Sequence, residues 1–356
     1  MVEAMLPWMS FTADPGRVHS EGRTARAALE DARAKVAALL GARPREVVFT
    51  SGATEAIAAA VWGAVERGPH QVVPAVEHSA VRDAAARYDV TEVGVDGLGR
   101  VDADEVAAAI RPGETALVHV QWANHEVGTV QPVAEVVDAV RRRAPGVLVH
   151  VDAAAAAGHV PIDFATLEAD LVSVSAHKLG GPQGIGALVV RRGLRLRPLL
   201  LGGAQERSRR AGMENVAAAV GFGAAAETLA VTLAPEAARA RAQTDAALTA
   251  ATAIEGVTAY GDPDGRLPHL VCMGVDGVEA EAVLLGLDQA GVAAHSGSAC
   301  SSESLEPSPV LAAMGVAAER SLRVSVGWST TDDDVAAFSR ALPEVVQRLR
   351  RLGARQ

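Results

Sequence analysis

The chain has 356 residues, 49% of them hydrophobic, and its 33 Lys and Arg residues against 43 Asp and Glu residues give a formal charge of -10. This length excludes a small binding module and allows one large domain with a smaller one. The negative charge excludes a general attraction to nucleic acid or to an anionic membrane, and we expect neither as a partner.

The first residues, MVEAMLPWMSF, lack the basic start and the small-residue cleavage site of a secretory signal. Charges, glycines or prolines interrupt every apolar run, so we expect no segment with the roughly 20 apolar residues that cross a bilayer. The two cysteines, Cys272 and Cys300, are too few for a disulfide framework and lack the clustering of a zinc site, so no metal is expected. These features together predict a cytoplasmic protein.

Residues 23–230 alternate between helical and strand patterns, which predicts parallel strands joined by crossover helices. One helix is expected from residue 23 to Gly41, and another over 133–143. Strands are expected at 46–50, 71–76, 115–121, 147–152, 170–176 and 186–192. Their nearly continuous apolar content is typical of a sheet that is covered on both faces.

After Gly202 and Gly203 the pattern changes to long Ala-rich helices over about 214–250. Beyond them, the sequence predicts strands at 269–275 and 321–328 and helices at 278–290 and 331–351. This mixture indicates a smaller α+β domain. We therefore expect a large domain over 16–235 and a small domain made of 1–15 and 236–356.

The segment SGATEA, residues 51–56, follows an apolar strand directly. A Gly-containing turn there would open a helix whose first backbone N–H groups are free to bind an anion, and a phosphate is the natural ligand. Many helices begin with Ser or Thr caps, so an ordinary helix start is the alternative.

Asp152 stands at the end of the apolar strand VHVD, where a carboxylate is costly unless a cation or several donors meet it. The carboxyl edge of a parallel sheet is a ligand site. An Asp there could hold a pyridine nitrogen protonated, which is the condition that makes pyridoxal phosphate (PLP) an electron sink. The alternative is a strand-end Asp that caps the next turn.

The segment SVSAHKLGGPQGIGAL places Ser175, His177 and Lys178 at the end of a strand, before a glycine-rich loop. An amine flanked by apolar residues would have its pKa lowered by desolvation, which favours the neutral form that attacks an aldehyde. Ser175 and His177 could reach the same phosphate as the SGATEA turn. The spacing from Asp152 favours a Schiff-base lysine over a surface lysine.

These motifs resemble those of fold-type I PLP enzymes of aminotransferase class V, and within them the cysteine desulfurases. The resemblance implies an α/β large domain whose mainly parallel seven-stranded sheet lies between helices, with a smaller α+β C-terminal domain. It also implies that Lys178 is the Schiff-base lysine and Asp152 the pyridinium partner. The implied phosphate-binding set is Ala53, Thr54, Ser175 and His177.

His78, in AVEHSAV, resembles the family's histidine that stacks on the cofactor ring and carries protons. A lone histidine after a strand is otherwise read as a packed or capping residue. Arg323, in SLRVSVG, alternates with apolar neighbours, and the matching family Arg binds the substrate carboxylate by two parallel hydrogen bonds. Asn124 is expected beside the substrate as well.

Cys300 lies in the Gly/Ser-rich stretch HSGSACSSESLEPSP, where a cysteine is chemically accessible. It resembles the nucleophile of desulfurases whose long loop carries the sulfur away. Cys272 lies within the apolar run HLVCMGV, which predicts a small core residue.

The resemblance implies conversion of L-cysteine to L-alanine with a persulfide on Cys300, which supplies sulfur for iron-sulfur clusters or thiolation through an acceptor protein. The segment GGAQERSRRAG, residues 202–212, resembles the stretch that reaches the phosphate of the neighbouring subunit. A homodimer with shared sites is therefore expected.

Four departures from the family pattern concern the cofactor pocket and the start of the chain. The opening strand and turn of the family have no counterpart here, so the N-terminus is expected to be shortened. Asn124-His125 replaces the usual Asn-Asn, Ala155 replaces a Gln, and Met213 replaces a Thr. His125 could still donate a hydrogen bond to the cofactor, whereas Ala155 could not.

Two alternatives therefore stay open. One is a PLP lyase or aminotransferase with another amino-acid substrate, in which Cys300 is not the nucleophile. The other is a catalytically weak paralogue that serves as a binding or dimerisation partner in sulfur transfer.

Overall fold

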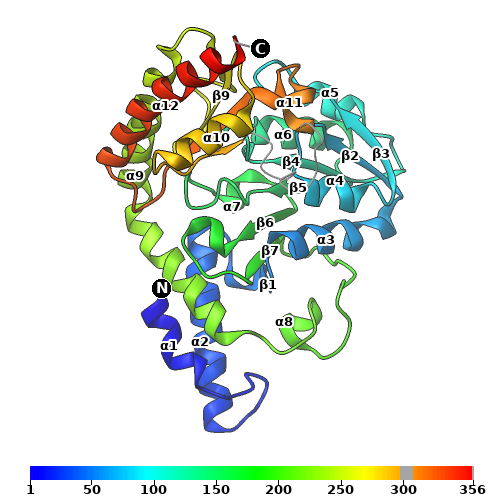
Figure 1. The fold of residues 1–356 in the computed structure, drawn as a ribbon. Helices are drawn as coiled ribbons and strands as arrows, with labels where there is room; N and C mark the ends of the chain where they lie inside the picture. The colour runs from blue at the N-terminus through cyan, green and yellow to red at the C-terminus, as the bar shows by residue number, and fades with distance from the viewer. Residues whose placement is uncertain (297–307, 355–356) are drawn as a thin grey trace. The chain divides into compact units, whose positions relative to one another are not determined.

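The computed structural model describes residues 1–296 and 308–354 (Figure 1). The chain forms two compact units, each assembled from separate stretches of sequence. The first unit comprises Met1–Val93, Asp102–Trp122 and Pro132–Leu233, and the second comprises Gly94–Val101, Ala123–Gln131 and Ala234–Gln356.

The first unit contains a seven-stranded sheet in the order β1-β7-β6-β5-β4-β2-β3. Its strands are β1 (Val47–Thr50), β2 (His70–Pro74), β3 (Asp89–Val93), β4 (Thr115–Gln121), β5 (Leu148–Asp152), β6 (Leu171–Ser175) and β7 (Gly186–Val190). Strand β7 runs antiparallel to β6 and β1, whereas the pairs among β2 to β6 are parallel. The predicted α/β class with a mainly parallel seven-stranded sheet is confirmed.

The burial of each strand explains whether it could be predicted from the sequence. Strands β1, β2 and β4 to β7 are buried at every position, so they read as apolar runs. Strand β3 was not predicted. It lies at the edge of the sheet and buries only Val93, so it carries no continuous apolar signal.

Helices accompany the strands of the first unit. They are α1 (Val2–Met9), α2 (Ser20–Leu39), α3 (Ala53–Ala64), α4 (Ser79–Ala85), α5 (Ala103–Ala108), α6 (Val133–Arg143), α7 (Phe164–Leu167) and α8 (Gln205–Ser208), with 3-10 helices η1 (Pro44–Glu46), η2 (Val65–Arg67) and η3 (Ala176–Leu179). Helix α6 shows the pattern: its valines recur at helical spacing from Val133 to Val140 and are buried, while three arginines occupy its last turn, where they favour the negative helix end.

Helix α9 (Val216–Thr252) starts in the first unit and ends in the second. By length and composition it is apolar enough to cross a membrane, which corrects the expectation that no segment would be. Its most apolar 18-residue window has a mean hydropathy of 1.7 and is 44% buried. The window keeps this mean hydropathy although glycines interrupt it, and a core helix of a soluble protein meets the same criterion.

The second unit contains an antiparallel sheet in the order β10-β11-β9-β8. Its elements are β8 (Val257–Tyr260), β9 (Leu270–Val275), β10 (His295–Ser296), β11 (Ser321–Ser325), α10 (Ala280–Gln289), α11 (Pro309–Ala313), α12 (Asp332–Gly353) and the 3-10 helix η4 (Ala318–Arg320). Met273, Leu287 and Phe338 bring β9, α10 and α12 into one apolar cluster. The predicted smaller domain with its own sheet is therefore present.

The unit boundaries differ from the predicted domains in two ways. Gly94–Val101 and Ala123–Gln131, expected in the large domain, group with the second unit. Residues 1–15 group with the first unit and not with the small domain. The reason is a close approach of α1 to α9, where a Cβ added at Gly221 would lie 2.6 Å from the sulfur of Met5. How the two units divide the catalytic work stays a prediction.

Candidate active site

The turn after β1 and the end of β6 meet at one edge of the seven-stranded sheet. Gly186 of β7 pairs with both Thr50 and Ser175, which places β1 and β6 on either side of it. A Cβ at Gly186 would lie 2.7 Å from the Gly52 Cα, so only glycine allows this approach. The predicted phosphate-binding turn and Ser175 are therefore brought together.

Helix α3 begins at this turn without a side-chain cap on Gly52. Its neighbour Ser51 donates its N–H to the Glu55 carboxylate at 2.8 Å, and Arg210 binds the same carboxylate at 2.9 and 3.2 Å. Burial alone would raise the pKa of Glu55, but the hydrogen bonds from Arg210 and Ser51 lower it below its ordinary value. An uncapped helix start is the donor arrangement that an anion requires.

Ser175, His177 and Lys178 lie where β6 passes into the 3-10 helix η3. The Ser175 Oγ and the His177 Nδ1 are 2.8 Å apart. Partial burial lowers the pKa of His177, and the charge of Lys178 lowers it further. A neutral imidazole is therefore favoured at this position.

The expected burial of Lys178 among apolar residues was wrong. Its sequence neighbours Ala176 and Leu179 are buried, but Lys178 itself is exposed. A 3-10 turn advances about three residues per turn, so adjacent side chains point in different directions. In the single chain the amine is therefore accessible from solvent.

Asp152 ends β5 and is 7% exposed. Its Oδ1 accepts from the Ser173 hydroxyl at 3.1 Å and from the Ala154 N–H at 3.0 Å. In the described part of the chain, both hydrogen bonds to this carboxylate end on Oδ1. Asp152 thus caps the following turn, as the alternative interpretation held, and keeps Oδ2 for another donor.

His78 caps helix α4, with its Nδ1 accepting from the Ala80 N–H at 3.0 Å. The capping alternative is therefore correct for Nδ1, and it places the proton of a neutral ring on Nε2. Together with Thr54, Trp62 and Tyr88, His78 lines a pocket of about 540 Å³. The structure thus brings His78 and Thr54 to one cavity.

The remaining described site residues belong to the second unit. Asn124 is fully buried, and its Oδ1 accepts from the N–H groups of Glu126 at 2.8 Å and Val127 at 2.9 Å. Arg323 donates from Nη1 to the His125 carbonyl at 3.0 Å. Arg323 and the 124–127 turn are therefore joined within this unit.

Cys300 lies outside the described residues. Cys272 is 1% exposed on β9, as expected for a core residue. Burial, helped by the charge of Glu126, raises the pKa of its thiol to about 12. A protonated, buried thiol is a poor nucleophile.

The chain matches the family model described as aminotransferase class-V over residues 3–338. The chain belongs to the aminotransferase class V family. Cysteine desulfurase IscS 1 of Archaeoglobus fulgidus is 41% identical over 363 residues, which cover 98% of this chain and 94% of that relative. A cysteine desulfurase of Trichormus azollae is 42% identical, with 99% of this chain and 90% of the relative covered.

Comparison with solved structures supports the same assignment. A NifS-like protein has a TM-score of 0.91 at 30% identity, covering 98% of this chain and 95% of that one. A structure described as SspA in complex with cysteine has a TM-score of 0.81 at 30% identity, covering 91% and 94%. These findings confirm the predicted fold type, the PLP dependence and the enzyme class of a cysteine desulfurase.

The described residues of this class V chain fit a PLP molecule. The uncapped start of α3 with Ser175 and His177 offers donors to a phosphate, and Asp152 offers Oδ2 to a ring nitrogen. Lys178 follows on the same strand end. The individual roles of these residues stay predictions.

Sequence reasoning missed a buried ion pair that fixes the segment before α9 in this class V fold. Arg33 is 1% exposed and binds the Glu206 carboxylate at 2.6 and 2.7 Å, and the Phe49 N–H donates to the same carboxylate at 3.0 Å. Glu206, Arg207 and Ser208 all have φ between 48° and 63°. This left-handed run is costly for non-glycine residues, so the ion pair must hold it in place.

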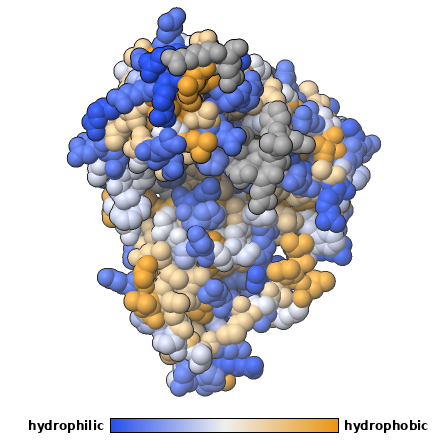
Figure 2. Space-filling model, in the orientation of Figure 1, coloured by the Kyte–Doolittle hydropathy of each residue, from blue (hydrophilic) through white to orange (hydrophobic). Residues whose placement is uncertain are grey.

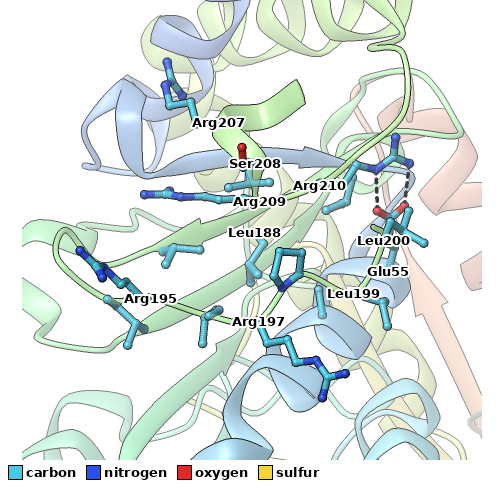
Figure 3. A pocket seen from close by; sticks show the side chains of 17 residues that line it. Glu55, Leu188, Arg195, Arg197, Leu199, Leu200, Arg207, Ser208, Arg209 and Arg210 are labelled. Carbon is cyan, nitrogen blue, oxygen red and sulfur yellow. Dashed lines mark hydrogen bonds and ion pairs between the residues drawn. The ribbon is translucent and has the colours of Figure 1, made fainter. Parts of the chain in front are cut away.

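The same segment lines a pocket of about 300 Å³ in the first unit (Figure 3). Figure 3 shows Arg210 directed at Glu55, with further arginines around the cavity. Its charged lining residues are Glu55, Arg195, Arg197, Arg207, Arg209 and Arg210. The arginine-dense runs RRGLRLR and ERSRR were the sequence signal for this cationic site.

Proposed function

We propose that this chain converts L-cysteine to L-alanine and keeps the sulfur as a persulfide on Cys300. The observation that carries the proposal is one sheet edge that holds the 51–54 turn, Ser175 and Lys178, in a chain whose relatives are cysteine desulfurases. Arg323 would bind the carboxylate of L-cysteine, with Asn124 in the adjoining turn.

In this proposal most of the residues that hold PLP belong to the first unit. Ala53, Thr54, Ser175 and His177 would bind its phosphate, Asp152 its ring nitrogen, and Lys178 its aldehyde carbon. His78 would stack on the ring, and His125 would donate to its phenolic oxygen. Bound PLP would supply an electron sink for breaking bonds at the substrate carbons.

The chain's own groups then move protons and sulfur. Once displaced by the substrate amine, the Lys178 Nζ accepts the Cα proton. The His78 Nε2, on the side of the ring away from its helix cap, carries a proton to and from the substrate. The Cys300 thiolate forms a bond with the substrate sulfur while the Cβ–S bond breaks. Alanine leaves after Cβ gains a proton and the Lys178 Nζ returns a proton to Cα.

The proposal includes a cytoplasmic homodimer and a sulfur-acceptor protein that takes the persulfide sulfur for iron-sulfur clusters or thiolation. Large apolar side chains of the first unit are exposed in the single chain, among them Leu6, Met9, Leu201 and Met213. Figure 2 shows apolar patches interrupting an otherwise polar face. A second copy that covers part of this surface would shield it from water.

One observation favours a second candidate, a catalytically weak binding partner in sulfur transfer. Ala155 has no side-chain donor, and Met213 is 62% exposed with no hydroxyl for a phosphate. Losing one hydrogen bond to a charged cofactor oxygen would cost about 1.5 to 3 kcal/mol of PLP affinity.

The test is the visible absorption of the purified protein with PLP, before and after adding L-cysteine. Alanine and sulfide are measured together in the presence of a thiol reductant, which reduces the persulfide and releases its outer sulfur as sulfide. We expect a Schiff-base band that shifts with L-cysteine, and equal amounts of alanine and sulfide. Lys178→Ala should abolish the band and the turnover. Cys300→Ala should abolish sulfide release, whereas Cys272→Ala, the matched cysteine control, should retain it.

If PLP gives no band and no alanine forms, the binding-partner candidate replaces the enzyme. If the band forms but Cys300→Ala turns over normally, the proposed role of Cys300 as sulfur acceptor is wrong.

A further inference from the structure

Four hydrogen bonds link side chains of four strands inside the seven-stranded sheet. Gln71 Oε1 of β2 lies 2.9 Å from His119 Nε2 of β4, and His119 Nδ1 lies 3.0 Å from His150 Nδ1 of β5. His150 Nε2 lies 3.2 Å from the Ser173 Oγ of β6, which donates to Asp152 Oδ1 at 3.1 Å. Gln71, His119, His150 and Ser173 thus form a hydrogen-bonded row. The row ends on the Asp152 carboxylate, which would face PLP.

The register of the sheet explains why these side chains meet. His119 is the direct partner of His150, and Asp152 is the direct partner of Ser173. His150 and Asp152 are two residues apart on β5, so they point to the same face. The row thus crosses β4, β5 and β6 on one face of the sheet.

The row is closed to water. Gln71 is 1% exposed, and His119, His150 and Ser173 are 0% exposed. Burial lowers the pKa of His119 well below its ordinary value and that of His150 to about 4. Both imidazoles are therefore neutral at physiological pH, and each contributes one proton to the row.

A count of protons fixes the direction of the row. Four hydrogen bonds need four protons, and His119, His150 and Ser173 supply three. The fourth comes from Gln71 when its NH₂ group faces His119. A half-turn of the amide gives this arrangement, in which the Gln71 Nε2, unpaired among the described residues in the other orientation, donates to His119.

With the amide so placed, every proton points toward Asp152. Gln71 donates to His119, which donates to His150, which donates to Ser173, which donates to Asp152. Hydrogen bonds that run in one direction polarise one another, so the last donor is strengthened. A strengthened donor on Oδ1 fixes the plane of the carboxylate.

We propose that Gln71, His119, His150 and Ser173 are positioning residues that fix the Asp152 carboxylate and keep its Oδ2 directed at the PLP ring nitrogen. The inference rests on the proposed function, because it assigns these residues to the predicted partner of Asp152. None of the four touches the substrate or the reacting atoms in the proposed reaction.

The experiment measures the cofactor and not turnover. PLP labelled with ¹⁵N in the ring is added to the protein, and its ¹⁵N chemical shift and dissociation constant are recorded. We expect a protonated ring nitrogen in the unchanged chain. Ser173→Ala should move the shift toward the unprotonated form and weaken PLP binding about ten-fold, the size of one lost hydrogen bond to a charge. Ser173→Thr keeps the hydroxyl and should restore both readouts.

A second set of variants tests the row against a general loss of packing. His150→Leu should resemble Ser173→Ala, and Gln71→Leu, three hydrogen bonds from Asp152, should have a smaller effect of about three-fold. His70 is the matched control: it is equally buried on β2 but bonds Thr115 at 2.7 Å and Thr91 at 2.8 Å, outside the row. His70→Leu should leave the ¹⁵N shift unchanged.

Asp152→Asn separates failure of this inference from failure of the proposed function. If Asp152→Asn removes the protonated signal while Ser173→Ala and His150→Leu leave it intact, the positioning role is overturned and the PLP site stands. If Asp152→Asn also changes nothing, the assignment of Asp152 itself fails, and the inference falls with it. Equal effects of His70→Leu and His150→Leu would also overturn it, since packing alone would then explain both.

Discussion

The two sheets of the molecule bury different kinds of side chain. The four-stranded sheet of the second unit packs Val271, Met273 and Leu322 into a cluster of apolar residues. The seven-stranded sheet of the first unit buries His119 and His150 among its valines, with each ring fully enclosed. Both interiors are closed to water, so burial alone does not decide their composition.

The difference shows what a charged group at the edge of a sheet requires. Polar groups in an apolar interior are costly unless their hydrogen bonds are made, and in the first unit they are made to one another. Among the described residues, no strand of the second unit's sheet ends on a buried carboxylate, and its apolar packing needs no such compensation. Substitutions in each interior should therefore differ in what they remove.

The largest loss of stability is expected from the buried ion pair of the first unit. Glu206→Ala leaves the Arg33 guanidinium, 1% exposed, without its main partner, and the unfolding free energy should fall by about 4 kcal/mol. Burial would lower the pKa of Arg33, but Glu206 raises it above its ordinary value, so the charge persists. Urea unfolding measures the loss. Glu66→Ala is the control, because Glu66 lies 3.9 Å from Arg197 on the surface and should cost less than about 0.5 kcal/mol.

A core truncation in the second unit should cost slightly less. Met273 is 0% exposed, and Met273→Ala should remove about 3 kcal/mol through lost contacts and a residual cavity. Binding of PLP to the folded protein should not change, because this residue has no polar role. A clear loss of PLP affinity in the folded variant would contradict the contrast between the two interiors.

The polar interior should also make stability depend on pH. The unfolded chain binds a proton on His150 near its ordinary pKa, whereas the folded chain does so only near pH 4. The contribution of the buried, neutral His150 to the free energy of unfolding is therefore complete above the ordinary pKa, and it falls as the pH drops toward 4. Between about pH 7.5 and pH 5 this one residue should remove about 2 kcal/mol. Urea midpoints across this range should fall less steeply in His150→Gln; an unchanged slope would mean that the ring is not buried and neutral.

The smallest effect is expected where the second unit does bury a polar group. Ser308 caps α11 and donates to Glu126, and both residues are buried. Ser308→Ala should cost about 1 kcal/mol, the usual value of a lost cap. Ser308→Thr keeps the hydroxyl and should cost less, so equal losses would assign the effect to packing.

The sequence could predict those elements of the fold in which consecutive residues have the same exposure to solvent. The strand over 115–121 was predicted to the residue, because every position is buried and the whole run is therefore apolar. Edge strand β3 was missed because most of its positions face solvent. Lys178 was misjudged for the related reason that its neighbours in sequence do not share its exposure in η3.

Pairings between distant residues were beyond sequence reasoning. His119 and His150 stand on different strands, and only the register of β4 with β5 makes them neighbours. Arg33 and Glu206 are joined in the same way from distant parts of the chain. The resemblance to desulfurases supplied Asp152, Ser175 and Lys178 as a set, but nothing in it described the row behind Asp152.

The inert thiol of Cys272 has a practical consequence for chemical labelling. The chain has two cysteines, and one of them is enclosed with its pKa raised to about 12. An alkylating reagent applied to the native protein should therefore add one label per chain, and that label should lie on Cys300. Mass spectrometry of the intact chain can then count the sulfur atoms at a single known position, turnover by turnover, without replacing any residue.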